Sequence, residues 1–456
     1  MSKLEVGFSR VDVTPSTGIG VAGYYKRRIS DGVLDALEAT AIALRVGETT
    51  ALLVSVDTLY FPTAVAHRFR GEIAAATGLP AEAILLHATH IHTGPYLIDS
   101  GWHAEMPEGH GELVRAYLDF LGHRLADACC EAIEDLSPAS MGYAVGRVEN
   151  VAFIRRFRMK DGSVRTNPGI GNPEILEPLT TVEDRLSLVR FDREGKSCVA
   201  LFHFGLHPDV IGGTKFTADW PGFARRTLEA ALPDVSFAFV NGAQGDVNHV
   251  NVKTDSIDYE GGVRMDFGQR NGYGHARYIG RAVAGGVLRI FDKVIACDVE
   301  ALTFRDVTVA YAANKASPEQ LPEARRINDL HLSGRDELLP YKNAELTTVV
   351  AEAARMVALE SAPDFFEMPL IGLSVGPVAL LGIPGEPFTG AGRGIRATEG
   401  KTHELILPLC CTNGYEGYFP TKDAYDEGGY EARASRYKAG TAEKMIADAI
   451  AILKGL

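Results

Sequence analysis

Two histidines lie two residues apart in the stretch Leu85-Leu86-His87-Ala88-Thr89-His90-Ile91-His92-Thr93-Gly94-Pro95. The apolar residues from Ile84 onward predict a short buried strand, and the Thr-Gly-Pro sequence predicts the loop that ends it. In an extended segment, residues two apart point to the same face. His90 and His92 can therefore face one cavity, where one imidazole would hold a metal ion and the other would move a proton. For so short a motif, two structural histidines at a strand end are an equally open interpretation.

Other apolar segments of the chain are also followed directly by side chains that can bind a metal or transfer a proton. The carboxyl ends of strands in open α/β sheets are where such proteins bind ligands. Three nitrogen or oxygen donors from separate strands, with one open position, are typical of a catalytic zinc site. From spacing alone, such a site and a set of unrelated polar loops stay equally open. The residues concerned are His207 after 198–204, Asp246 after 236–240, Glu386 after 378–383 and Tyr418 beyond 404–409.

The order of the expected elements indicates an α/β fold. A strand at 51–56, a helix at 63–77 and the histidine-bearing strand form a β-α-β unit, which is the unit of a parallel sheet. We therefore expect a mixed or parallel multi-stranded sheet with flanking helices and a metal site at the carboxyl ends of the strands. Residues 1–456 are expected to form one catalytic domain, with a helical insertion at about 318–360. A single last helix is expected from about 430 to 453.

Composition narrows the possible partners. The chain has 456 residues, of which 46% are hydrophobic and 23% charged, as in ordinary globular proteins. Its net charge of −13 and the lack of a basic cluster argue against nucleic acid and against anionic membranes as partners. The first residues lack the apolar segment of a secretory signal, and the sequence has no C-x-x-C pair for a thiolate zinc site. We expect a cytoplasmic protein with a small-molecule substrate, and a homo-oligomer is compatible with these features.

Five short motifs, in order, resemble those of the neutral ceramidase family, whose members are zinc amidases. Each motif is modest by itself, but five in the right order are specific, and together they run from residue 6 to about 440. The motifs are Thr89-His90-Ile91-His92-Thr93-Gly94-Pro95 against the family's T-H-T-H-S-G-P, His207-Pro208, Asn241 to Asn248 against N-x-G-D-V-S-P-N, Ile383-Pro384-Gly385-Glu386, and Tyr415-x-x-Tyr418-x-x-Thr421-x-x-x-Tyr425 followed by Tyr430-Glu431.

The resemblance implies a role for each matching residue. His92 would transfer the proton, and Tyr430 would polarise the carbonyl group of the substrate. Arg155 falls near an active-site arginine of the family and is a candidate substrate contact, although Ile154 stands where the family has asparagine. One zinc ion per chain is implied, with a ligand set made of His90, His207, Glu386 and Tyr418.

The chain departs from the family at the reacting centre. The serine of G-D-V-S-P-N is Asn248 here, and the following proline is His249. Asparagine cannot act as a nucleophile in the manner of serine, so a covalent serine route is excluded, while a metal-activated water remains a complete mechanism. His249 would be a second acid or base, a substrate contact or a structural residue, and Asp246 is another candidate base. Gln244 and Asn248 are candidate substrate contacts.

These observations predict a zinc-dependent hydrolase that cleaves an amide or ester bond in a small, polar, sugar-derived or similar substrate through metal-activated water. We do not expect ceramide to be the substrate, because no membrane feature and no counterpart of the C-terminal sandwich domain of secreted ceramidases is expected. Two alternatives stay open. One is a metal-dependent lyase or isomerase acting on a sugar acid, and the other is a non-catalytic metal-binding homologue.

Overall fold

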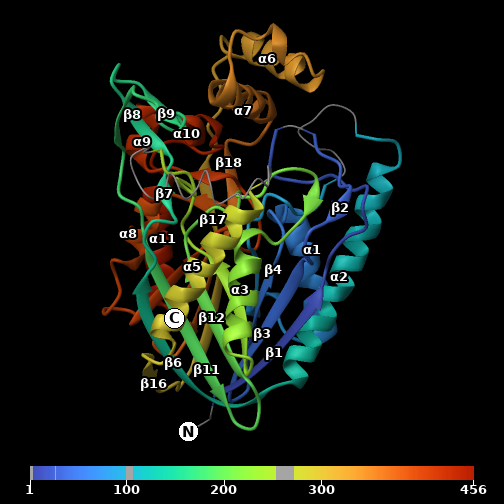
Figure 1. Cartoon of the computed structure of the whole chain (residues 1–456), viewed down its shortest axis with the longest axis vertical. Helices are drawn as coiled ribbons and strands as arrows, with labels where there is room; N and C mark the ends of the chain where they lie inside the picture. Colours follow the sequence, from blue (N-terminus) through green and yellow to red (C-terminus); the bar gives the residue numbers. More distant parts are fainter. Residues whose placement is uncertain (1–3, 26, 99–105, 253–271) are drawn as a thin grey trace.

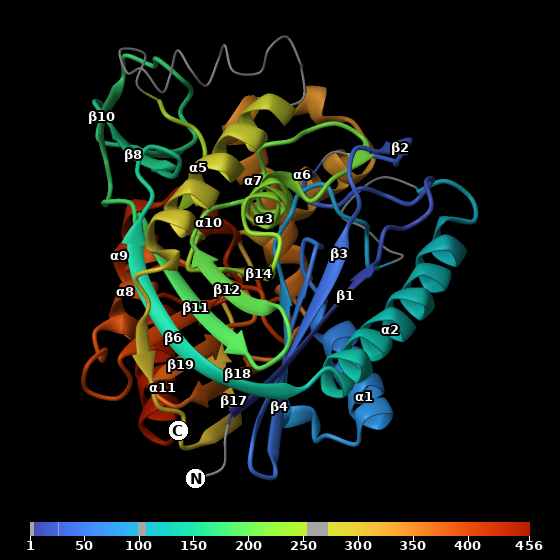
Figure 2. The same cartoon turned by 60° about the horizontal axis from the view of Figure 1, so that its bottom comes forward.

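Two stacked β-sheets form the framework of the protein, and helices cover the outer face of each sheet (Figures 1 and 2). The computed structural model describes residues 4–25, 27–98, 106–252 and 272–456. Within these residues the larger sheet has nine strands, in the order β14-β12-β11-β6-β1-β3-β4-β5 with β16 beside β6, and the smaller has the order β17-β18-β19-β21. The strands are β1 Leu4–Asp12, β3 Glu38–Val46, β4 Thr49–Val56, β5 Ile84–Ala88, β6 Ser137–Arg147, β11 Arg185–Arg193, β12 Cys198–Phe204, β14 Val235–Asn241, β16 Ile295–Cys297, β17 Leu302–Ala312, β18 Phe365–Val375, β19 Val378–Gly382 and β21 Leu405–Leu409.

The alternation of side chains along each strand builds the layers. In β3, Ile42 and Leu44 belong to the core between the sheets, together with Leu373 and Leu380 of the smaller sheet. The alternate residue Ala43 faces the opposite side and packs toward helices. Because successive side chains of a strand point to opposite faces, strands that are apolar on both faces bury both of them. The helices are α1 Thr63–Thr77 and α2 His110–Glu134 over one half of the larger sheet, α3 Asp219–Ala231 and α5 Tyr273–Phe291 over the other, and α8 Thr389–Arg396 and α11 Thr441–Lys454 over the smaller sheet.

Three parallel strand pairs carry the residues of interest to one end of the molecule. The pairs are β4 with β5, β12 with β14, and β19 with β21, and the other ladders of the two sheets are antiparallel. A helix connects the two strands of each pair, namely α1, α3 and α8. Such a crossover is the connection that parallel neighbours require. The predicted α/β fold with a mixed sheet and flanking helices is therefore confirmed.

The two ends of the larger sheet's strand order, β5 and β14, also meet in space. The backbone N–H of Asn241 in β14 donates to Nε2 of His87 in β5, at 3.0 Å. The Oγ of Ser55 in β4 donates to the carbonyl oxygen of Phe239 in β14, at 2.6 Å. This approach brings the segment after β5 close to the segments after β12 and β14.

His87 is locked in one neutral form at this junction. Its Nε2 accepts from Asn241, so Nδ1 carries the proton and donates to Oγ1 of Thr412 at 3.0 Å. Thr412 in turn donates to the carbonyl oxygen of Cys410 at 2.9 Å, which leaves its own oxygen free to accept. Burial lowers the pKa of His87 to about 3. Protonation of Nε2 would place two donors against each other in a buried site.

We expect the protein to lose stability on acidification partly through His87. The pKa of its side chain is about 3 in the folded chain and about 6.5 in the unfolded chain, so protons bind the unfolded state first. The neutral imidazole's contribution is complete above pH 6.5 and is lost as the pH falls toward 3, by about 2 kcal/mol between pH 7 and 5. The measurement is urea unfolding at pH 7 and at pH 5. His87→Asn should be less stable than the natural protein at pH 7, and its free energy of unfolding should fall by about 2 kcal/mol less on going to pH 5. An equal pH dependence in both proteins would contradict this assignment.

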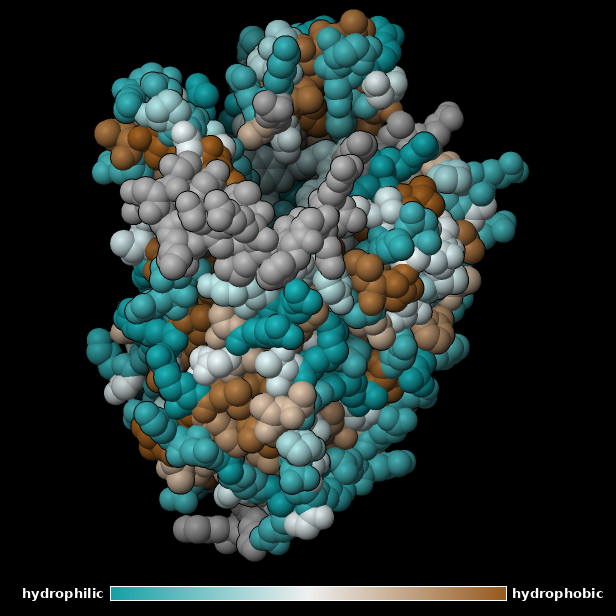
Figure 3. All heavy atoms as spheres, in the orientation of Figure 1, coloured by the Kyte–Doolittle hydropathy of each residue, from teal (hydrophilic) through white to brown (hydrophobic). Residues whose placement is uncertain are grey.

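Two small structures lie above the carboxyl ends of the parallel strands (Figure 1). One is helical and consists of α6 Leu321–Leu332, a short 3-10 turn Asp336–Leu338 and α7 Asn343–Leu359, where helix is predicted at 318–360. The other is a three-stranded sheet made of β8 Arg156–Met159, β9 Val164–Thr166 and β10 Ile175–Pro178. Figure 3 shows a hollow in the surface between the two projections. That the chain is one domain with α6 and α7 as an insertion stays a prediction.

The predicted single helix over 430–453 is wrong. The chain forms α10 Tyr430–Ala434 and α11 Thr441–Lys454, separated by residues 435–440, of which the first, Ser435, has an extended backbone (φ −62°, ψ 129°). The hydroxyl of Ser435 explains the break, because it donates to the carbonyl oxygen of Tyr418 at 3.0 Å and accepts from the Tyr425 hydroxyl at 2.9 Å. These contacts are tertiary and leave no periodic signal in the sequence. Among the helices of the described residues, none has the length and apolar character to span a bilayer.

Candidate metal centre

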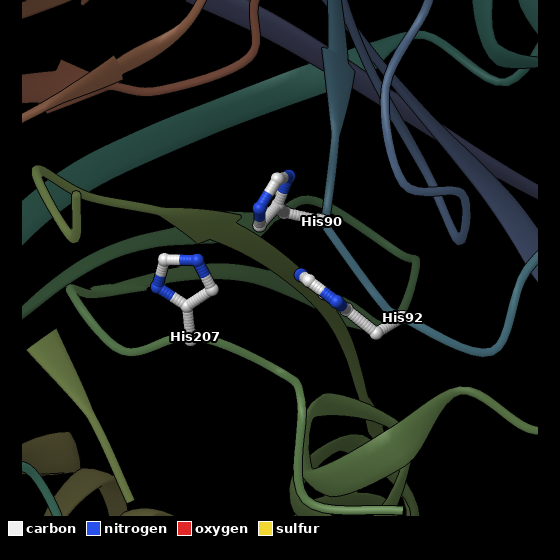
Figure 4. Close-up of side chains that lie close together, drawn as sticks. All are labelled: His90, His92 and His207. Atoms are coloured by element: carbon white, nitrogen blue, oxygen red, sulfur yellow. The ribbon is translucent and has the colours of Figure 1, made fainter. Parts of the chain in front are cut away.

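His90, His92 and His207 converge beyond the ends of β5 and β12 (Figure 4). The ring centroid of His90 lies 5.1 Å from that of His92 and 5.0 Å from that of His207. The predicted convergence of His90 and His92 is found, but its predicted cause, strand alternation, is wrong. The strand ends at Ala88, and His90 has a left-handed backbone with φ 72°. Backbone hydrogen bonds hold this turn, from His90 N–H to Thr58 at 2.9 Å and from His92 N–H to Pro208 at 3.0 Å.

Two of these imidazoles are oriented by backbone carbonyl groups. Nδ1 of His90 donates to the carbonyl oxygen of Leu59 at 2.8 Å, and Nδ1 of His207 donates to that of Val247 at 2.9 Å. The proton of each neutral ring is thus on Nδ1, and Nε2 presents a lone pair. Burial, together with the nearby guanidinium of Arg155, lowers the pKa of His207 to about 4 and keeps that ring neutral. A carbonyl partner on the far nitrogen is the usual support of a metal-binding histidine.

Glu386 completes a cluster of acceptors. Its Oε2 lies 3.3 Å from Nε2 of His90 and 3.0 Å from Nε2 of His207, and all three side chains are buried. Its Oε1 accepts from the hydroxyl of Tyr415 at 2.6 Å, and Oε2 accepts from Nε2 of Gln244 at 3.3 Å. Two lone-pair nitrogens facing a carboxylate oxygen repel one another unless a cation lies between them. The donor set therefore fits a divalent metal ion with nitrogen and oxygen ligands.

Unsatisfied atoms strengthen this fit. Within the described residues, Nε2 of His90 and both ring nitrogens of His92 are buried without a hydrogen-bond partner. Buried polar atoms without partners are rare in native proteins and call for an ion or a ligand. The ligand atoms of His90, His92 and His207 lie within 4.8 Å of one another, so these three histidines could also hold a metal ion together.

Tyr418 enters the site through a strand pairing. Glu386 and Tyr418 are directly opposite each other in the parallel pair β20 Glu386–Pro387 and β22 Tyr418–Phe419. The guanidinium carbon of Arg155 lies 5.4 Å from the centre of the Tyr418 ring. Oε1 of buried Glu431 accepts from Nε of Arg155 at 2.7 Å, and the carbonyl oxygen of Gly245 accepts from the same guanidinium at 2.7 Å. Arg155 is thereby fixed beside both Tyr418 and His207.

Tyr430 and the loop that contains Gly23 line the space beside the metal centre. The hydroxyl groups of Tyr430 and Tyr25 are 3.2 Å apart, and burial raises the pKa of Tyr430 well above 10, so it keeps its proton. Gly23 has φ 113°, and a Cβ atom there would lie 2.8 Å from the His92 ring. Only glycine adopts such a backbone without strain. The loop therefore packs its backbone directly against His92.

The metal centre opens into a cavity of about 820 Å³ between the two projections above the sheets. This volume is typical of a small-molecule site. A smaller cavity of about 120 Å³ reaches His90, Glu386 and Tyr415. The larger cavity is lined by Gly23, Tyr24, Tyr25, Arg27, His92, Arg155, Thr166, Asn167, Asp209, Tyr418 and Tyr430, and by residues 331–350 of the helical projection, among them His331, Asp336, Leu346 and Val350.

The other predicted site residues lie around this centre and line neither cavity. Asp246 accepts from the backbone N–H and the Oγ1 of Thr389, at 2.8 and 2.9 Å, and so holds the start of α8. Nδ2 of Asn248 donates to Asn167 at 2.7 Å, and the ring of His249 lies 5.4 Å from that of His275. Gln244 contacts Glu386 as described. The roles predicted for these four residues as bases or substrate contacts stay predictions.

Sequence reasoning gave no role to five residues of the site. Asp209 directly follows the His207-Pro208 motif, and Tyr415 and Glu431 lie inside motifs that were used only for the resemblance. The available signal was a polar side chain within three positions of a residue already singled out, namely His207, Tyr418 or Tyr430. Tyr24 and Tyr25 stand in the glycine-rich loop 18–25, far from the other residues in sequence. Its glycines could let the backbone approach a ligand, and a plain surface loop was the other interpretation, so neither tyrosine was a candidate.

Comparisons with known proteins bear on the fold of the chain. No protein-family model and no curated protein matches the sequence. Among solved structures, the neutral ceramidase from Pseudomonas aeruginosa matches with a TM-score of 0.71 and 18% identity, covering 100% of this chain and 74% of that one. A structure described as ceramidase complexed with C2 matches with a TM-score of 0.69 and 17% identity, covering 100% and 75%. The chain has the neutral ceramidase fold. The predicted resemblance is thus confirmed at the level of the fold.

Proposed function

We propose that this chain is a zinc-dependent hydrolase of the ceramidase fold that cleaves an amide or ester bond in a small polar substrate. The observation that carries the proposal is the cluster of three buried acceptors, Nε2 of His90, Nε2 of His207 and Oε2 of Glu386, next to His92, which lines the large cavity. His90, His207, Glu386 and Tyr418 would hold the ion. Zinc bound there would supply Lewis acidity toward a carbonyl oxygen and would lower the pKa of a water toward about 7.

The chain's own residues divide the remaining work. His92 lines the large cavity next to the acceptor cluster, and neither of its ring nitrogens has a hydrogen-bond partner among the described residues, so it is free to take a proton from the attacking water. The hydroxyl of Tyr430 would donate to the carbonyl oxygen of the substrate as negative charge develops there. Arg155, fixed by Glu431, would keep Tyr418 and His207 in place.

The volume of the large cavity supports a substrate of small-molecule size. Its wall combines polar side chains, among them Asp209, Thr166 and Asn167, with tyrosine rings and with Leu346 and Val350 of α7. A volume of about 820 Å³ matches a molecule of drug-like size.

Metal analysis combined with a substrate panel tests the proposal. Protein purified without added metal should contain about one zinc per chain by elemental analysis. Hydrolysis of chromogenic amides or esters should be lost with a chelator and restored by zinc. The absence of any transition metal, with no gain on adding zinc, would refute the metal centre. Formation of an unsaturated or isomerised product from a sugar acid would instead favour the lyase or isomerase alternative.

We also expect no enzyme-like turnover of long-chain ceramide. Asn248 occupies the position of the family serine, and its amide is bound to Asn167 rather than directed at the cavity. The assay is release of fatty acid from ceramide in detergent micelles, with the chromogenic substrate as a positive control. Turnover in the usual enzyme range of about 1–10³ s⁻¹ would contradict this expectation.

A further inference from the structure

Asp209 is a carboxylate in the substrate cavity whose role is not explained by the metal centre. It follows His207 and Pro208, and its Oδ1 lies 3.7 Å from Nδ1 of His92. This separation is too long for a hydrogen bond, so Asp209 does not orient the imidazole directly. The hydroxyl of Tyr24 donates to the same Oδ1. The side chain is 28% exposed and lines the large cavity together with Tyr24 and His92.

The carboxylate of Asp209 has few hydrogen-bond partners in the protein. Oδ1 accepts one hydrogen bond, whereas an ionised carboxylate can accept about four. Among the residues that the structure describes, no lysine or arginine forms an ion pair with Asp209. Arg28 is close by, but its guanidinium stacks on the Tyr24 ring at 4.1 Å and donates to backbone carbonyl groups, including that of His92 at 2.7 Å.

Other carboxylates of this chain have a basic side chain as a partner. Glu431 is paired with Arg155, and Asp57 with Arg225. Asp336, which lines the same cavity from the helical projection, accepts from Nδ1 of His331 at 2.9 Å. A carboxylate removed from bulk water costs free energy unless it is paired. Asp209 is therefore available to a donor that arrives through the cavity.

We infer that Asp209 selects substrates that carry a hydroxyl or ammonium group on the carbon next to the reacting carbonyl. The inference rests on the proposed hydrolase function and names the substrate class of that site. The short distance between Asp209 and His92 supports this inference. A substrate group that donates to Asp209 would be attached to the carbon next to the carbonyl carbon that the water activated by His92 attacks. Hydroxyl and ammonium share the chemistry of donation to a carboxylate, and a methyl group of the same size lacks it.

Three isosteric hydroxamates test the inference without turnover. Hydroxamates chelate catalytic zinc, and glycolic, glycine and propionic hydroxamate differ only in a hydroxyl, an ammonium or a methyl group at the relevant carbon. Calorimetry on the zinc-loaded protein should show the hydroxyl or the ammonium compound binding about 10–100-fold more tightly than the propionic one, as expected for a hydrogen bond to a charged group. The preferred compound identifies the donor.

Variants assign the preference to Asp209. Asp209→Leu should abolish it while propionic hydroxamate binds as before. Asp209→Asn should lose a preference for ammonium but keep part of a preference for hydroxyl, since an amide oxygen still accepts. Asp336→Asn is the matched control in the same cavity and should leave the preference unchanged. Thermal unfolding of each variant checks that the fold is intact.

Each of the following three outcomes would contradict the inference. An unchanged preference in Asp209→Leu would assign it to direct chelation, and an equal loss for all three compounds would make Asp209 a structural residue. Equal binding of the three compounds to the natural protein would remove the preference itself. In these cases, binding of propionic hydroxamate leaves the proposed metal function standing. If propionic hydroxamate does not bind the zinc-loaded protein, the proposed function falls and the inference falls with it.

Discussion

Replacing His92 with alanine should leave the metal bound and lower kcat by roughly 10²–10⁴-fold, the usual contribution of a positioned acid or base. His92 lies beside the acceptor cluster and lines the large cavity, and its ring nitrogens have no hydrogen-bond partner among the described residues. Its loss removes the proton acceptor but none of the contacts that orient His90 and His207. The measurements are zinc content and kcat on a substrate verified with the natural protein.

The neighbourhood of His92 offers a matched control. His110 is also buried and contacts the same glycine loop, accepting from the backbone N–H of Gly20 at 3.0 Å, but it lines neither cavity. His110→Gln should therefore change kcat little. Loss of zinc in His92→Ala would make His92 a ligand, as in the three-histidine arrangement. An unchanged kcat would return His92 to a structural role and would transfer the base role to His249 or Asp246.

The second large effect is expected for His207→Ala, which should bind little or no zinc. His207, in the loop after β12, contributes an Nε2 lone pair that lies 3.0 Å from Oε2 of Glu386. In the natural protein, zinc at about 1,000 times its Kd should raise the free energy of unfolding by about 4 kcal/mol. In the variant, added zinc should raise it by much less.

His203 separates metal loss from general destabilisation. It lies on the same strand and is buried, but its Nε2 is bound to the carbonyl oxygen of Pro408 at 2.9 Å. His203→Ala should be less stable than the natural protein and still gain stability on adding zinc. If His207→Ala retains zinc and its stabilisation, the proposed ligand set is wrong.

The sequence alone was sufficient for the features that depend on local pattern. The apolar run of 198–204 predicted a strand that the structure has at the same residues, because a continuous apolar segment can only be buried on both faces. Placing His90, His207 and Glu386 directly after such runs predicted that they would meet. The assumed reason, one common sheet edge, does not hold, because Glu386 follows β19 of the smaller sheet. The five motifs in order also predicted the ceramidase fold.

The tertiary structure decided what the site residues contact. His90 has a left-handed backbone that no alternation rule predicts, because tertiary hydrogen bonds hold its turn. Asp246, similar to Glu386 in the sequence pattern, is directed at Thr389 instead of the cavity. Asp209 faces His92 only because the loop after β12 packs against the loop after β5. These contacts join residues far apart in the chain, so their geometry depends on packing between sheets and leaves no periodic trace in the sequence.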